Sequence, residues 1–300
     1  MKLAKLVATM ALGGTMLACS LTAPSGPSMP TIVAGTLQAM TTPVAANPTA
    51  APAGPTSAPA PTQPAGTQVT FGNVSFVLPA GLASGASSAT VPAVDAQGGP
   101  TWDAAPAFTR FSLQAYPLQN KFFEPQIMVY PAQAYAGVNN GAAISIQRLQ
   151  SILANPSGTL SNEVLPRLPY ANAEQIIGGQ AKVITFDGGS GVRVLAEYAQ
   201  GFESINNNEL FYHFEGLSTD GKSYIVAVLP INAAFLAATS DVNAPVPADG
   251  IPFPVNASDA TAYTNYFSAV TGKLDATTPD AFLPTLTVLY ALMQSFRISP

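Results

Sequence analysis

The fold of this chain is decided by four consecutive segments, AKVITF (181–186), VRVLAEYAQ (192–200), ELFYHFEGL (209–217) and SYIVAVL (223–229). They are rich in the β-branched and aromatic residues that favour strands. The stretches between them carry the Gly, Asn, Asp and Ser residues that favour turns. Short turns join antiparallel neighbours, whereas parallel strands need long crossovers, so this block predicts a β-meander.

The same reasoning extends toward the N-terminus. Gly72-Asn73 separates the β-prone runs 68–71 and 74–78, a pattern typical of a two-residue hairpin turn. Further strands are expected at 108–116 and 126–130. The expected sheet therefore includes more strands than the meander alone.

Helices are expected at three places. The run 142–153 has an apolar stripe and ends before Asn155-Pro156. A second helix is expected from Ser258 or Asp259 to Val270, and a third is expected to start at Thr278-Pro279-Asp280. The sequence thus predicts an α+β fold, a mainly antiparallel sheet with helices packed on one face.

The N-terminus has the features of an export signal. Lys2 and Lys5 precede an apolar run, 6–18, that ends at Cys19, the single cysteine of the 300-residue chain. A positive start followed by an apolar run too short to span a bilayer is typical of a secretory signal peptide. One cysteine cannot form a disulfide within the chain, so a disulfide framework is excluded.

The residues Leu17-Ala18-Cys19-Ser20 resemble the lipobox of bacterial lipoproteins. The resemblance implies a signal peptide over 1–18 and a lipid on Cys19, which becomes the mature N-terminus in that family. Met16 and Leu17 stand where the family usually has a leucine and a small residue. Cleavage by the ordinary signal peptidase and an uncleaved anchor are therefore the alternatives.

A tether is expected after Cys19. The segment 20–67 consists largely of Pro, Ala, Thr, Ser and Gly, and no charged residue occurs between Cys19 and Val94. Such a composition cannot bury a core, and its prolines favour extended conformers. We therefore expect a disordered tether over 19–67 and a single globular domain over 68–300.

The charge balance limits the partners. The chain has a formal net charge of −5, and loss of Lys2 and Lys5 with the signal makes it more acidic. No basic cluster is present. This disfavours nucleic acid and anionic lipid as partners.

Motifs for chemistry are weak. The stretch Asp187-Gly188-Gly189-Ser190-Gly191 has neither nucleophile-elbow nor phosphate-loop spacing and is interpreted as a hairpin turn. No metal site is predicted. Zinc usually needs several His or Cys ligands, and the chain has one of each. Calcium needs clustered oxygen ligands, and Asp241-Val242-Asn243 does not continue as a calcium-binding loop. We expect no cofactor and assign no catalytic residue.

His213 is the only histidine of the chain. Strand alternation places it on one face with Phe211 and Glu215. If the preceding loop closes symmetrically around Ser204 and Ile205, that face also contains Val192, Val194, Ala196 and Tyr198. A structural histidine is favoured, and a general base is the alternative.

Glutamates and aromatic residues gather in the meander. Glu197, Glu203, Glu209 and Glu215 are interpreted as a solvated face or, alternatively, as carboxylates for glycoside cleavage. The aromatic residues are interpreted as core residues or, alternatively, as residues that stack against a bound sugar or peptide. They are Tyr198, Phe211, Tyr212, Phe214, Tyr224, Tyr263, Tyr266 and Phe267.

A further resemblance rests on the segments LPRLP (165–169), GSGVR (189–193), EYAQ (197–200), INNNELFY (205–212) and GLSTDGK (216–222). With these, residues 68–235 resemble a family of uncharacterised exported bacterial proteins. The resemblance implies one domain and transfers no catalytic residue.

Together these observations predict a lipid-anchored protein on the outer face of a bacterial membrane, at the cell surface or in the periplasm. We expect a non-enzymatic binding module whose partners are the membrane, through the lipid, and an envelope protein, glycan or small molecule. A structural or assembly factor of the envelope would have the same features. The alternative is an enzyme, an envelope hydrolase that acts on glycan or peptide through His213 and the glutamates of 191–217.

Overall fold

A computed structural model of the chain describes residues 66–95, 101–167, 173–255 and 260–299. The predicted signal peptide (1–18), Cys19 and all but the last two residues of the predicted tether (19–67) lie outside the described residues. Gly66 and Thr67 already belong to the first strand. None of the described helices is both long enough and apolar enough to cross a membrane.

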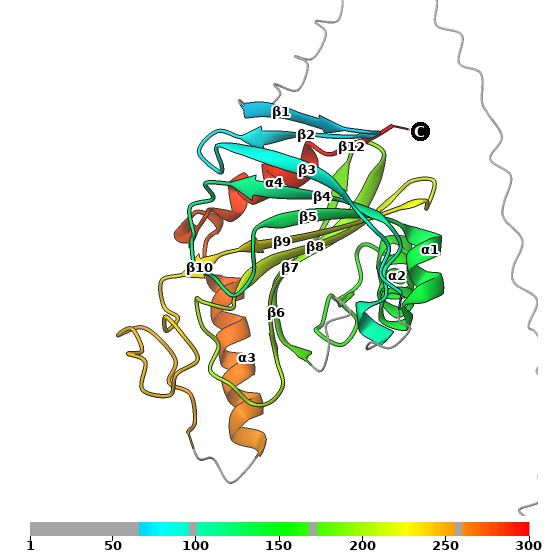
Figure 1. Ribbon diagram of the computed structural model, residues 1–300. Helices are drawn as coiled ribbons and strands as arrows, with labels where there is room; N and C mark the ends of the chain where they lie inside the picture. Colours follow the sequence, from blue (N-terminus) through cyan, green and yellow to red (C-terminus); the bar gives the residue numbers. More distant parts are fainter. Residues whose placement is uncertain (1–65, 96–100, 168–172, 256–259, 300) are drawn as a thin grey trace, which may run out of the picture. The chain divides into compact units, whose positions relative to one another are not determined.

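A seven-stranded antiparallel sheet forms the centre of the fold, with the strand order β3-β4-β5-β9-β8-β7-β6 (Figure 1). Its strands are β3 (Gly85–Val91), β4 (Phe108–Gln114), β5 (Gln126–Pro131), β6 (Glu174–Phe186), β7 (Gly189–Ala199), β8 (Phe211–Ser218) and β9 (Ser223–Pro230). The predicted meander is confirmed, because β6, β7, β8 and β9 are sequential neighbours. The non-local pairing of β5 with β9 joins it to the earlier strands.

Two smaller sheets and the helices complete the fold. The predicted N-terminal hairpin is confirmed, with Phe71 opposite Val74 across the turn. It is joined by a C-terminal strand in a three-stranded sheet of order β1-β2-β12. The remaining elements are β1 (Gly66–Phe71), β2 (Val74–Pro79), β10 (Asn232–Ala233), β11 (Phe282–Leu283), β12 (Arg297–Ile298), α1 (Ala132–Val138), α2 (Asn140–Ala154), α3 (Ala260–Ala276), α4 (Leu286–Gln294) and two short 3₁₀ turns, η1 (Thr101–Asp103) and η2 (Pro279–Ala281).

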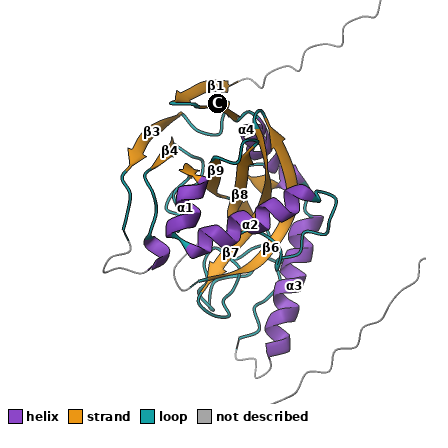
Figure 2. Ribbon diagram, turned by 90° about the vertical axis from the view of Figure 1, so that its right-hand side faces the viewer, coloured by secondary structure: helices purple, strands orange, loops and turns teal. Residues whose placement is uncertain are grey.

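The α+β class and the mainly antiparallel sheet are confirmed, but the expectation of helices on one face is wrong. Helices α1 and α2 pack on one face of the large sheet (Figure 2). Helices α3 and α4 and strand β2 pack against the other. The reason is that every residue of β8 is buried, so both faces of the sheet need a cover.

The last helix begins later than the sequence predicts. Thr278-Pro279-Asp280 leads only into η2, and α4 starts after Thr285, whose hydroxyl oxygen accepts a hydrogen bond from the Val288 amide at 3.3 Å. Pro284 explains the difference, because proline disfavours the helical conformation in the residue before it and removes a backbone donor. The other two predicted helices correspond to α2 and α3.

Several elements were not predicted. Among the longer ones these are β3, α1 and the first half of β6, and among the short ones β10, β11, β12 and η1. Strand β3 has the sequence GASSATV, whose small residues have weak strand preference. It forms through pairing with β4, a tertiary contact that no local pattern indicates.

The glycines near the β6–β7 turn have two different functions. Gly188 has a φ of +89°, as the predicted hairpin turn requires. Gly191 instead lies within β7 opposite Gly216, and a Cβ on Gly191 would lie 2.3 Å from the Glu215 carbonyl oxygen and 2.5 Å from Cζ of Phe214. Its small size therefore lets β7 approach β8 and the Phe214 ring.

We predict that Gly191→Ala destabilises the fold by about 1–3 kcal/mol, the usual cost of overpacking a closely packed site. The measurement is urea denaturation followed by circular dichroism. Gly137→Ala is the matched control, because nothing lies within 4 Å of a Cβ at this position in α1. The control should keep or increase the stability, and equal losses in both variants would contradict the packing argument.

Candidate functional site

His213 lies where strand alternation predicts. It faces α2, opposite Val194 in β7, and Ala196 lies opposite Phe211. Val192, Val194, Ala196, Tyr198 and Phe211 belong to the same buried cluster, so the predicted face is confirmed. The side chain of His213 is only 1 % exposed.

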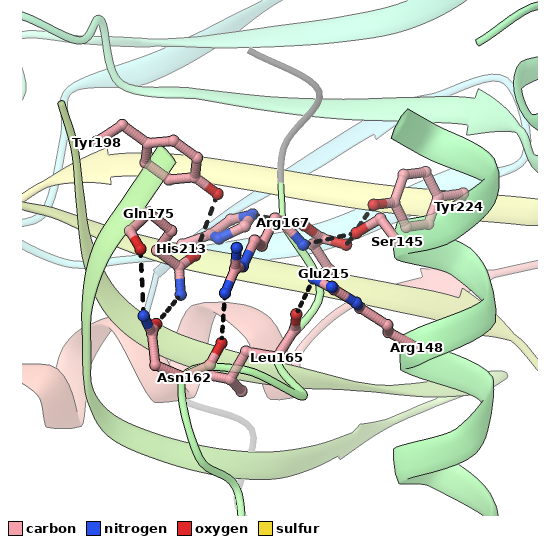
Figure 3. A network of polar contacts seen from close by, with 10 residues as sticks. All are labelled: Ser145, Arg148, Asn162, Leu165, Arg167, Gln175, Tyr198, His213, Glu215 and Tyr224. Carbon is pink, nitrogen blue, oxygen red and sulfur yellow. Dashed lines mark hydrogen bonds and ion pairs between the residues drawn. The ribbon is translucent and has the colours of Figure 1, made fainter. Parts of the chain in front are cut away.

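A buried network surrounds Glu215, which is also 1 % exposed (Figure 3). Its Oε1 lies 3.0 Å from His213 Nε2, an electrostatic contact without hydrogen-bond geometry. Its Oε2 accepts hydrogen bonds from Ser145 Oγ at 2.6 Å and from the Tyr224 hydroxyl. Burial and the nearby Glu215 raise the pKa of Tyr224, and the same causes raise the pKa of Tyr135 to about 12.

The network continues into the segment that covers β6 and β7 (Figure 3). The Arg167 amide donates to Ser145 Oγ at 2.7 Å, and Arg167 Nη2 donates to the Asn162 carbonyl at 3.1 Å. Gln175 Nε2 donates to Asn162 Oδ1 at 2.7 Å, and the Tyr198 hydroxyl donates to Gln175 Oε1 at 3.1 Å. These bonds fasten α2 and its following loop to the sheet, so the network has a structural role.

The four glutamates of the meander have different environments. Interpretation as a solvated face is wrong for Glu197 and Glu215, which are 0 % and 1 % exposed. Glu197 accepts hydrogen bonds from the backbone amide and the side chain of Asn206, at 3.0 and 3.1 Å. Only Glu203 and Glu209 are half-buried, and both line a pocket.

This pocket, which we call the acidic pocket, has a volume of about 430 Å³. It is lined by Phe122 and Phe123 from the β4–β5 loop, by Tyr198 at the end of β7, and by Glu203 and Glu209 from the β7–β8 loop. Phe122 is 67 % exposed, an unusual position for a large apolar side chain. The Phe122 amide donates to the Asn208 carbonyl at 3.0 Å, which holds the two loops together.

The electrostatics of the acidic pocket favour a cation. Among the described residues, neither Glu203 nor Glu209 forms an ion pair. Burial, followed by repulsion from Glu203, raises the pKa of Glu209. Burial raises the pKa of Glu197 as well, and the charges of Glu209 and Glu203 add to the effect. Lys121, which precedes Phe122 of the pocket lining, donates instead to the Asn207 carbonyl and to Asn232 Oδ1.

The structure separates the residues that the sequence grouped. His213 and Glu215 lie in the core under α2, whereas Glu203 and Glu209 line the acidic pocket. Sequence reasoning missed Phe122 and Phe123, although two adjacent phenylalanines in a loop between strands were a signal. It also missed Ser145, which only the packing of α2 brings to Glu215.

The described residues include no group of three His, Cys, Asp or Glu side chains arranged to hold a metal ion. A scan against models of protein families, a search of curated proteins and a search of solved structures found no match to this chain.

We predict that Glu215→Ala lowers the free energy of unfolding by about 3–5 kcal/mol, as expected when one partner of a buried polar network is removed. Ser145 and Tyr224 then lose their common acceptor, and His213 loses the carboxylate beside it. Urea denaturation at pH 7 measures the effect.

Asp103→Ala is the control for this experiment, because Asp103 is exposed in η1 and takes no part in the network. Its unfolding midpoint should match that of the unmodified protein. A Glu215→Ala midpoint equal to that of the control would show that the network does not hold α2 to the sheet.

Proposed function

We propose that this chain is an exported, lipid-tethered binding protein whose ligand carries a cationic amine. The observation that carries the proposal is the acidic pocket, which is lined by two glutamates that form no ion pair with a described residue and by Phe122, Phe123 and Tyr198. Its volume lies in the range of about 300–1,000 Å³ that is usual for small-molecule sites.

Two physical effects support a cationic ligand. An ammonium group is attracted to the faces of aromatic rings and to carboxylates, and partial burial strengthens both interactions. A bound cation also relieves the repulsion between Glu203 and Glu209 that raises the pKa of Glu209. Binding therefore favours the ionised form of this carboxylate.

The proposed location of the protein, outside the cytoplasm and attached to a membrane, rests on the N-terminal sequence. Lys2, Lys5, the apolar run 6–18 and Cys19 support export and lipid attachment, and the proline-rich segment 20–67 supports a spacer between the membrane and the domain. A binding protein benefits from such reach, because a spacer lets the pocket sample the space around its anchor. The resemblance to exported bacterial proteins agrees with the proposed export.

An envelope hydrolase is the second candidate function. The raised pKa of Glu209 beside Glu203 favours it, because a glycosidase needs one protonated and one ionised carboxylate. His213 does not contribute to this candidate, since it is buried under α2 outside the pocket. Release of reducing sugar from peptidoglycan, lost in Glu209→Gln, would favour this candidate over the binding protein.

We predict that the purified full-length protein binds n-butylammonium and tetramethylammonium saturably, measured by isothermal titration calorimetry. Glu203→Gln and Glu209→Gln should each weaken binding roughly tenfold, the usual effect of losing one charged partner. Affinity should fall as the pH is lowered from 7 toward 5, because Glu209 has a raised pKa and must be ionised to hold the cation.

Glu163→Gln is the control for binding, since it removes an exposed carboxylate outside the acidic pocket. It should bind as the unmodified protein does. Equal affinity of all variants, or affinity that rises as the pH falls, would exclude the acidic pocket as a cation site.

We predict that Cys19→Ala releases the protein from the membrane fraction, because the substitution removes the only site for a lipid thioether. Fractionation of cells that produce either form measures this. A matched Ser20→Ala variant should stay with the membranes. Equal fractionation of Cys19→Ala and the unmodified protein would contradict lipid attachment at Cys19.

A further inference from the structure

Arg193 presents a buried positive charge on the face of the sheet opposite His213. Its side chain is 7 % exposed and packs near Tyr212 and Tyr290. Among the described residues, Nε and Nη1 are buried without a hydrogen-bond partner, and Nη2 donates to Gln180 Oε1 at 3.5 Å. Within the described residues, no carboxylate lies at ion-pair distance from its guanidinium. A buried charge without a counter-charge is costly, so this arrangement needs an explanation.

A cavity of about 480 Å³ opens beside this guanidinium, which we call the bulge cavity. It is lined by Arg193 and Lys182, by Gly178 and Gln180 of β6, and by Asp275 of α3. Strand β6 is an edge strand, and its register with β7 shifts between Gly179 and Lys182. Bulges of this kind often occur beside binding sites, where they redirect side chains.

The bulge has a defined conformation. Gln180 has a φ of +55°, in the left-handed region that residues other than glycine seldom adopt. Its side-chain Nε2 donates to the carbonyls of Leu274 at 2.8 Å and Thr277 at 2.9 Å, and its backbone amide donates to Asp275 Oδ1. These hydrogen bonds to the end of α3 and the residue after it hold β6 in the bulged conformation, and Figure 1 shows α3 beside β6.

The charge of the bulge cavity is positive. Lys182 lies directly opposite Arg193 in the β6–β7 pairing, although like charges at such positions repel. Lys182 Nζ lies 5.3 Å from the ring centroid of Tyr290, and it forms no ion pair with a described residue. Asp275 is the one acid of the lining, and it already accepts from the Gln180 amide. Two cations therefore face one carboxylate.

We propose that the bulge cavity binds the phosphate group of a small phosphorylated molecule. Arginine and lysine are well suited to bind phosphate oxygens, the net charge of +1 of Lys182, Arg193 and Asp275 favours an oxyanion, and the cavity has room for the group with an attached organic body. The bound oxyanion supplies the counter-charge that Arg193 lacks within the protein. This site is independent of the acidic pocket, with which it shares no lining residue.

The test measures the melting temperature of the full-length protein with increasing inorganic phosphate or phenyl phosphate at constant ionic strength. A ligand that binds only the folded state stabilises it by RT ln(1 + [L]/Kd), so the melting temperature rises with the logarithm of the ligand concentration once that concentration exceeds Kd. We expect this increase, and in Lys182→Gln it should begin at a roughly tenfold higher concentration because the affinity is weaker. Arg193→Met should abolish the increase while keeping or raising the melting temperature without ligand, because it replaces an unpaired charge with an apolar side chain.

Lys222→Gln is the matched control, because Lys222 is exposed at the β8–β9 turn, where it pairs with Asp220. It should bind phosphate as the unmodified protein does. Acetate that binds as tightly as phosphate would overturn the assignment of a phosphate group. Equal responses of the unmodified protein and Lys182→Gln, or no increase in the melting temperature with phosphate, would overturn the site itself. This comparison remains valid even if Arg193→Met does not fold.

Discussion

The burial of both faces of the central strands is the constraint on which the rest of this structure depends. Every residue of β8 is buried, and all but the first residue of β9. One helical layer cannot cover two apolar faces, so α1 and α2 cover one face, and α3, α4 and β2 cover the other. The long-range pairing of β5 with β9 follows from the same demand, because it protects β9 from being an exposed edge.

This burial also makes every polar group in the central strands consequential. Glu215 accepts hydrogen bonds from Ser145 and Tyr224 and lies beside His213, so it strengthens the contact between α2 and the sheet. Among the described residues, Arg193 has no such set of partners, and Glu203 and Glu209 form no ion pair. The described part of the fold thus contains one polar network that is nearly complete and two places where charged side chains lack a counter-charge, which are the two proposed sites.

The two open sites lie where the regular structure is interrupted. The acidic pocket is formed by the loops that precede β5 and β8, and the bulge cavity lies at the register shift of the edge strand β6. Loops and bulges leave space that continuous strands would fill, and they are held in place here by hydrogen bonds to Asn208 and to the end of α3. The rigid sheet between them positions both sites.

The sequence by itself determined the strands of the meander, the N-terminal hairpin, helix α2, most of α3 and the side of β8 on which His213 lies. These follow from the periodicity of side chains and from turn residues, which are local properties. Tertiary structure alone decided the two-sided helical cover, the strand β3 and the two sites. Ser145 and Glu215, for example, meet across 70 residues of sequence. Local patterns indicate whether a side chain is turned inward, whereas the partner it meets there depends on how distant segments pack.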